Sequence, residues 1–206
     1  MSVRGRLAGA LGRSDERPNV ELAEALAAKP SAAAVTELVQ LLSTGTVAEQ
    51  NDAIKVLYEL GERTPEATAV HVDAFLGLLQ SKNNRNVWGA MSAIDTIAAA
   101  TPKQVAAALK DILAAADKGS VIAKDKAMST LAKLALAGEA KAVPALLERL
   151  EIAAVNQFPM YAELALPAVG AHRARLQAIL ERRLPDLPPA KQARVEKVLR
   201  KLGKTS

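Results

Sequence analysis

The sequence predicts an all-α protein built from packed helix pairs, and three observations lead to that fold class. Half of the 206 residues are apolar while only 2% are aromatic, and alanine and leucine, which lose little freedom in a helix, dominate the apolar set. Apolar residues recur at spacings of three and four, as on one face of a helix. The same apolar pattern then returns along the chain, which indicates a series of related two-helix units.

The repeat has a period of 37 residues and is clearest between the segments 31–66 and 68–103. Each unit has a first helix with three inward positions and a second helix with four. The first-helix positions are Val35, Leu38 and Leu42, then Val72, Phe75 and Leu79, then Leu109, Ile112 and Ala116. The second-helix positions are Ala53, Ile54, Leu57 and Leu60, then Ala90, Met91, Ile94 and Ile97, then Ala127, Met128, Leu131 and Leu134. Because a single pair cannot bury its apolar stripe alone, neighbouring pairs must stack.

Helix-start signals agree with this division. Thr46 and Glu49 form a capping-box pattern at the start of one second helix. Thr101, Pro102 and Gln104 predict a cap, a first-turn proline and a box partner before a first helix. Further helix starts are expected at Ser31, Asn84 and Ser120.

We expect residues 1–18 to be a flexible leader and residues 19–206 to be a single helical-repeat domain. A helix over 19–29, ended by Pro30, should cover the first unit. Pro167 should bend the second helix of the fourth unit or end it early. The expected repeats span about 31–66, 68–103, 104–140 and 141–171, followed by basic C-terminal capping helices over 172–206.

The repeat resembles the HEAT/armadillo superfamily of α-solenoids in the segments DAIKVLYELG, GAMSAIDTIA and KAMSTLAKLA. This resemblance implies a right-handed α-solenoid of about four stacked antiparallel helix pairs plus capping helices, with the second helices lining a concave binding face. HEAT units often carry an arginine near the start of the second helix. This chain has Gln50, Val87 and Lys124 there instead, so no subfamily is assigned.

Trp88 is the only tryptophan and lies where the repeat is otherwise polar. It precedes the inward residue Ala90 by two positions, or about 200° around the helix, and its repeat equivalents are Asn51 and Asp125. Trp88 therefore either anchors a partner, or packs on the preceding second helix or covers a turn. We interpret the protein as a non-catalytic scaffold that binds another protein through its concave surface. The expected binding residues are Lys55, Tyr58, Trp88, Asp95, Asp125 and Lys133.

The net charge of +5 is concentrated at the C-terminal end. Residues 172–206 contain 10 Lys and Arg against 3 Asp and Glu, whereas the remainder contains 17 against 19. Phosphate binding would use such a cluster, so nucleic-acid binding is the alternative function, and a solubilising face is the other interpretation. The candidate residues are Arg173, Arg175, Arg182, Arg183, Arg194, Arg200, Lys201 and Lys204.

Residue types needed for zinc binding and for nucleophilic catalysis are scarce. The chain has no cysteine, and its two histidines, His71 and His172, are 101 positions apart, so no zinc pattern or nucleophilic triad emerges. We therefore expect no metal, no cofactor and no enzymatic activity. No apolar run approaches the roughly 18 residues of a membrane span, and a cytoplasmic location is expected.

A less favoured alternative is an enzyme similar to the bacterial alkylpurine DNA glycosylases, which share the HEAT-like fold. Such an enzyme needs an aromatic cleft for a base. Tyr58, Trp88 and Tyr161 fall in three separate units, and no catalytic residue of that family is transferred to this chain.

Overall fold

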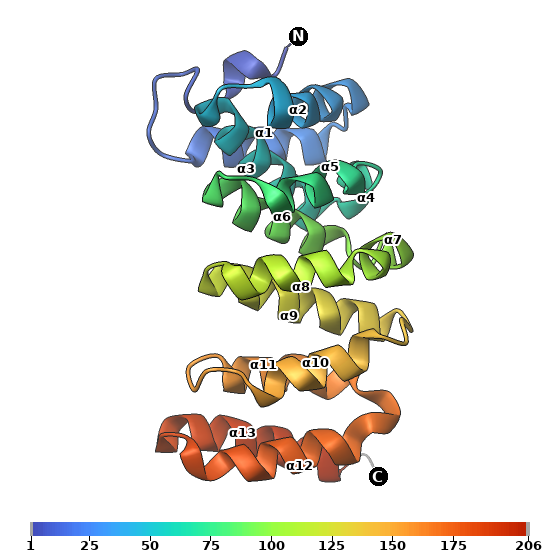
Figure 1. The fold of residues 1–206 in the computed structure, drawn as a ribbon. Coiled ribbons are helices and arrows are strands. Elements are labelled where there is room, and N and C mark those ends of the chain that lie inside the picture. Colours follow the sequence, from blue (N-terminus) through green and yellow to red (C-terminus); the bar gives the residue numbers. More distant parts are fainter. Residues whose placement is uncertain (1, 205–206) are drawn as a thin grey trace. The chain divides into compact units, whose positions relative to one another are not determined.

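The computed structural model describes residues 2–204, and these form helices and connecting segments without any strand (Figure 1). The all-α fold class predicted from the sequence is confirmed.

Contacts between residues divide the chain into two compact units, Met1–Ala127 and Met128–Ser206, whereas we expected one domain over 19–206. The first unit holds η1 (Arg4–Arg6), α1 (Arg17–Ala28), α2 (Ala32–Thr44), α3 (Val47–Arg63), α4 (Pro65–Ala69), α5 (Val72–Gly77), η2 (Leu78–Gln80), α6 (Asn84–Ile97), α7 (Pro102–Ala107), α8 (Leu109–Lys118) and the start of α9 (Val121–Leu136). The second unit holds the rest of α9, α10 (Ala142–Glu151), α11 (Phe158–Ala168), η3 (Gly170–His172), α12 (Arg173–Arg183), η4 (Leu184–Asp186) and α13 (Pro189–Gly203).

Helix α3 is the centre of the first unit, because α1, α2, α4 and α6 all pack against it. Ile54 and Leu57 of α3 and Met91 and Ile94 of α6 are almost completely buried. Every inward position predicted from the repeat in the second helices, over α3, α6 and α9, is buried, and so is every predicted position of the first helices over α2, α5–η2 and α8. The sequence period thus marks the residues that form the core.

Side-chain capping bonds form at some of the predicted helix starts. The capping box between Thr46 and Glu49 at the start of α3 is present, and Ser31 accepts a hydrogen bond from the backbone of Ala34 at the start of α2. The cap expected from Thr101 is not formed, because its hydroxyl donates to the carbonyl of Ile97 in the preceding turn. Pro102 nevertheless occupies the first turn of α7 as predicted.

Two of the predicted first helices are broken. The segment that follows α3 is divided into α4 and α5, and the segment that follows α6 is divided into α7 and α8. At the first break the backbone N–H of His71 donates to Thr68 and that of Ala74 donates to His71, which are i to i−3 bonds typical of a tightened turn. Neither break contains a proline or glycine, so the sequence offered no signal for them.

The N-terminal segment packs onto the first unit, in contrast to the flexible leader expected over residues 1–18. Leu7 is fully buried and Val3 is 3% exposed. The backbone N–H of Gly9 donates to Asp52 of α3 at 2.8 Å, and Asp52 also accepts from the side chain of Asn19 at 2.7 Å. These polar contacts give the segment a defined position.

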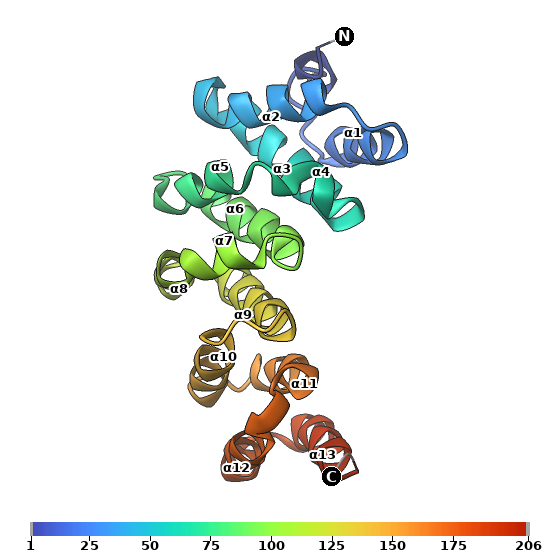
Figure 2. The ribbon, with the colours of Figure 1, turned by 90° about the vertical axis from the view of Figure 1, so that its right-hand side faces the viewer.

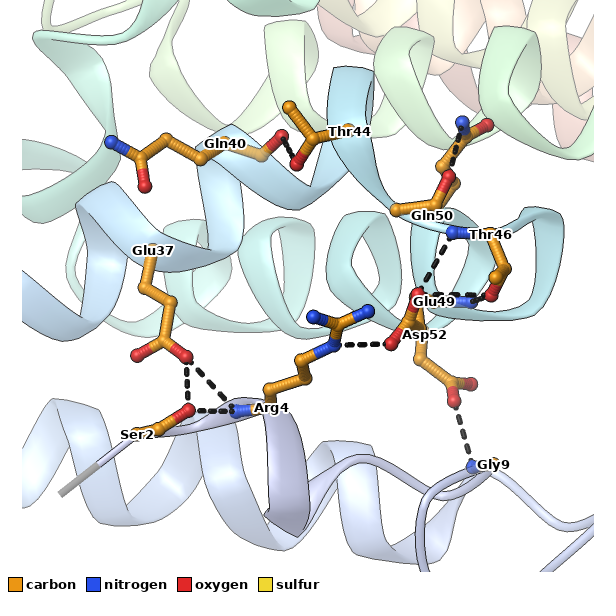
Figure 3. Close-up of polar contacts among 11 residues, drawn as sticks. Ser2, Arg4, Gly9, Glu37, Gln40, Thr44, Thr46, Glu49, Gln50 and Asp52 are labelled. Atoms are coloured by element: carbon orange, nitrogen blue, oxygen red, sulfur yellow. Dashed lines mark hydrogen bonds and ion pairs between the residues drawn. The ribbon is translucent and has the colours of Figure 1, made fainter.

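A second set of polar contacts holds the first residues of this segment, as Figure 3 shows. Arg4 forms an ion pair with Glu49, and the hydrogen bonds from Arg4 and then from Thr46 lower the pKa of Glu49 to about 2. Ser2 donates to Glu37 of α2. The N-terminal segment therefore contacts α2 and α3 through polar and charged groups, and it also buries Leu7.

In the second unit, α10 packs against α11 and α12, and α11 packs against α13. Figure 2 shows α12 and α13 side by side, and the contacts between them agree. Leu146, Leu150, Phe158 and Leu180 are fully buried. Pro167, which we expected to bend this helix or end it early, lies inside α11 one residue before its end, and the backbone N–H of Val169 still donates to the carbonyl of Ala165.

Replacing Leu7 with alanine tests whether the N-terminal segment is part of the core. Removing a fully buried leucine should lower the free energy of unfolding by about 2–4 kcal/mol. Leu11→Ala is the control, because Leu11 is 54% exposed and its loss should change stability by less than about 0.5 kcal/mol. Urea denaturation of both variants measures the difference. Equal stabilities for the two variants would show that the segment contributes nothing to the fold.

Candidate functional site

Two glycines allow α3 and α6 to approach closely. A Cβ added at Gly89 of α6 would lie 2.7 Å from Cγ1 of Ile54, and one added at Gly61 of α3 would lie 2.3 Å from Oγ1 of Thr96. Real side chains do not tolerate these distances, so only glycine permits this approach without a shift of the neighbours. The glycine next to Trp88 therefore has a packing role: it brings the helix that carries Trp88 onto α3.

This approach places two aromatic rings in contact. The ring centroids of Tyr58 and Trp88 are 6.0 Å apart with an angle of 53° between the planes, which is within the favourable range for a tilted aromatic pair. Each ring is also covered by a cation. Lys55 Nζ lies 4.7 Å from the centroid of Tyr58, and Arg85 Cζ lies 5.5 Å from that of Trp88. Tyr58 is 8% exposed, whereas Trp88 remains partly accessible.

Ion pairs surround the aromatic pair. Glu59 accepts from Lys55 at 2.7 Å and from Arg63 at 2.8 Å, and Arg63 also pairs with Glu24 of α1 at 3.2 Å. Glu16, which precedes α1, pairs with Lys55 at 3.3 Å and also with Arg85. We use the name α3/α6 surface for the set Glu16, Lys55, Tyr58, Glu59, Arg63, Arg85 and Trp88.

The pKa values on this surface are shifted by burial and by these pairs. For Glu59 burial raises the pKa, but the hydrogen bonds from Lys55 and Arg63 outweigh it, so the pKa lies below its usual value. For Lys55 burial lowers the pKa, but the hydrogen bonds with Glu59 and Tyr58 outweigh it and the pKa is raised. Burial raises the pKa of Tyr58 despite the nearby Lys55 cation. These groups therefore keep their ordinary charges around neutral pH.

Of the six residues predicted to bind a partner, Lys55, Tyr58 and Trp88 lie together. Asp95 is only 5% exposed and pairs with Lys126 at 3.4 Å, so it belongs to the interior of the first unit and not to an exposed strip. Asp125 is half-buried on α9 of that unit, whereas Lys133 belongs to the second unit.

Sequence reasoning did not identify Glu16 and Arg85, the two charged residues that contact the aromatic pair or its cations. Glu16 lies in the segment that we expected to be a flexible leader. Arg85 lies three positions before Trp88 on the same helix, a spacing that places two side chains on one face. The sequence could therefore have indicated Arg85 as a neighbour of Trp88. It contains no such indication for Glu16, which only the tertiary fold brings to the site.

Several of the basic residues proposed for nucleic-acid binding make contacts within the second unit. Arg182 pairs with Glu151, and Arg194 pairs with Glu163 at 2.7 Å. Arg183 donates to the carbonyl of Ala153 at 2.8 Å and covers the ring of Phe158, and Arg173 donates to the carbonyl of Leu202 at 2.7 Å. The other four candidates, Arg175, Arg200, Lys201 and Lys204, are exposed. Part of the excess positive charge of residues 172–206 therefore has a structural role within the second unit.

Two further features bear on the kind of site. Over residues 2–204, no three His, Cys, Asp or Glu side chains lie together so as to hold a metal ion. Within the same range no helix has both the length and the apolar character required to cross a bilayer. A hollow of about 200 Å³ is lined by Leu79, Val87 and Lys118 among others, and neither Tyr58 nor Trp88 lines it.

Comparisons with known proteins show a likeness in fold. No family model and no curated protein matches the chain. Two crystal structures of engineered proteins from the Northeast Structural Genomics Consortium are similar. One is 19% identical, with 99% of this chain and 98% of the other covered and a TM-score of 0.62. The other is 20% identical, with 97% and 58% covered and a TM-score of 0.57. At these identities the likeness concerns the fold alone.

The lowered pKa of Glu59 predicts how its contribution to stability depends on pH. A depressed carboxyl pKa stabilises the fold above the usual glutamate value of 4.5 and loses that effect as the pH falls through the folded-state value. Glu59→Gln should therefore lower the free energy of unfolding by about 1 kcal/mol at pH 7, and this deficit should shrink toward pH 3. Urea denaturation from pH 7 to pH 3 measures it.

The matched control is Glu66→Gln, which changes the same charge at an exposed position of α4 and should leave stability nearly unchanged. A Glu59→Gln deficit that is as large at pH 3 as at pH 7 contradicts the ion-pair explanation.

Proposed function

We propose that the chain is a right-handed α-solenoid of the HEAT/armadillo type that binds another protein through the α3/α6 surface. The architecture is supported by the burial of the apolar positions that recur every 37 residues. It is also supported by the packing within each helix pair, α2 with α3 and α5 with α6, and by the packing of α3 on α6, which joins these two pairs. In such arrays, the faces of stacked helices present extended surfaces to partners.

The observation that carries the binding proposal is the remaining exposure of Trp88, because its ring packs on Tyr58 of the preceding second helix, with centroids 6.0 Å apart, and is still not buried. Trp88 remains partly accessible while Tyr58 and the Arg85 guanidinium hold its ring. Tryptophan, tyrosine and arginine are the residue types most enriched at binding hot spots. A ring that is already fixed loses little conformational entropy on association, which favours affinity.

The ion pairs around the rings support the same proposal. Lys55, Glu59 and Arg63 satisfy one another before any partner arrives, so their mutual contacts hold the side chains in defined positions. Charged groups at the rim of an interface set orientation and association rate more than affinity. We assign the main contribution to binding energy to the aromatic pair and the selection of the partner to the surrounding charges.

Trp88→Ala tests this function directly. We expect it to weaken binding of the partner by at least about 2 kcal/mol, or roughly 30-fold. Affinity capture from cells followed by quantitative mass spectrometry identifies the partner, and titration of the purified pair gives the affinity. Val70→Ala is the matched control, because Val70 is an apolar residue that is 79% exposed on the short segment between α4 and α5.

The proposal requires that the wild-type protein and the Val70→Ala variant recover the same partner and that the Trp88→Ala variant does not. Recovery of that partner by a correctly folded Trp88→Ala protein contradicts it, and so does the absence of any specific partner for the wild-type protein.

A further inference from the structure

Glu16 joins two helices at the α3/α6 surface although it belongs to neither. It lies directly before α1, and its carboxylate pairs with Lys55 of α3 at 3.3 Å and with Arg85 of α6. The two cations lie over the rings of Tyr58 and Trp88. One carboxylate therefore lies between the two cations that cover the aromatic pair.

The three cations of this surface, Lys55, Arg63 and Arg85, are matched by three carboxylates only when Glu16 is in place. Glu16 and Glu59 belong to the surface, and Glu24 of α1 pairs with Arg63 from outside it. Without Glu16 one positive charge is in excess, and it is located at Lys55 and Arg85. Nε of Arg85 is also buried, with no hydrogen-bond partner among the described residues. The surface is thus complementary to a carboxylate that lies beside an apolar side chain.

Glu16 can leave this position without disturbing the start of α1. Its side chain makes no capping bond to the helix. Asp15 performs that role, because it accepts a hydrogen bond from the backbone N–H of Arg17 at 3.1 Å and pairs with Arg13. The Glu16 side chain is 40% exposed, so a change of its rotamer, without a backbone movement, removes the carboxylate from the two cations.

We propose that the α3/α6 surface binds an acidic peptide segment of a partner protein, with one carboxylate between Lys55 and Arg85 and a neighbouring apolar side chain on Trp88. Glu16 occupies the carboxylate position in the free protein and competes with this segment. The inference rests on the proposed protein-binding function and adds to it the chemistry of the partner and a contact that limits its affinity.

The probe is a pair of short synthetic peptides, acetyl-Gly-Leu-Glu-Leu-Gly-amide and its counterpart with glutamine in place of glutamate. Trp88 is the only tryptophan, so its fluorescence reports binding at this surface alone. The glutamate peptide should bind the wild-type protein at least about fivefold more tightly than the glutamine peptide. Glu16→Gln should then tighten binding of the glutamate peptide about tenfold, because the competing group no longer occupies the site.

Two variants separate this competition from a general charge effect. Glu21→Gln changes the net charge equally at an exposed position of α1 and should leave the affinity unchanged. Arg85→Gln, made together with Glu16→Gln, should remove the preference for the glutamate peptide. Circular dichroism confirms that each variant is folded before the titration.

Equal binding of the two peptides overturns the inference, and so does a Glu16→Gln affinity that does not differ from that of Glu21→Gln. Neither result would affect the Trp88→Ala experiment with the cellular partner. The proposed function and this inference are therefore tested independently of each other.

Discussion

The close approach of α3 and α6 is the constraint on which the first unit depends. Gly61 and Gly89 leave no space for a Cβ at the contact, where Ile54 and Thr96 lie against them. Helix α3 also contacts α1, α2 and α4, so the position of α6 is set against the element that organises the whole unit. A shift of a few tenths of an ångström at this contact would be transmitted to the core, because protein interiors are packed without spare volume.

The same approach explains how a largely aliphatic helical protein acquires a specific surface. With aromatic residues at only 2% of the chain, any contact between two of the rings requires the backbones to bring them together. Tyr58 and Trp88 are in contact, and the cations of Lys55 and Arg85 lie over their rings. Glu16 pairs with both cations and completes the network of charges. Packing therefore determines the position of the site, and electrostatics determines what the site prefers.

Much of the fold could be predicted because its signals are local or periodic. Helical spacing identified the buried faces, and the capping box of Thr46 and Glu49 marked the start of α3. What could not be predicted depends on tertiary contacts. Thr101 donates to the preceding turn in place of forming a cap, and Leu7 is buried only in the folded unit. Likewise Lys55, Tyr58 and Trp88 were found from the repeat register, whereas Glu16 reaches them across 39 residues of sequence from Lys55.

Substitution of Gly89 with alanine is the most direct measurement of the constraint between α3 and α6. Alanine favours the helix by up to about 1 kcal/mol, but the added Cβ meets the stiff, buried side chain of Ile54 at 2.7 Å, and overpacking costs about 1–3 kcal/mol. We predict that Gly89→Ala lowers the free energy of unfolding and shifts the Trp88 fluorescence. Gly77→Ala, where nothing lies within 4 Å of the new Cβ, should be neutral or stabilising. A Gly89→Ala protein as stable as Gly77→Ala, with unchanged fluorescence, would contradict the account.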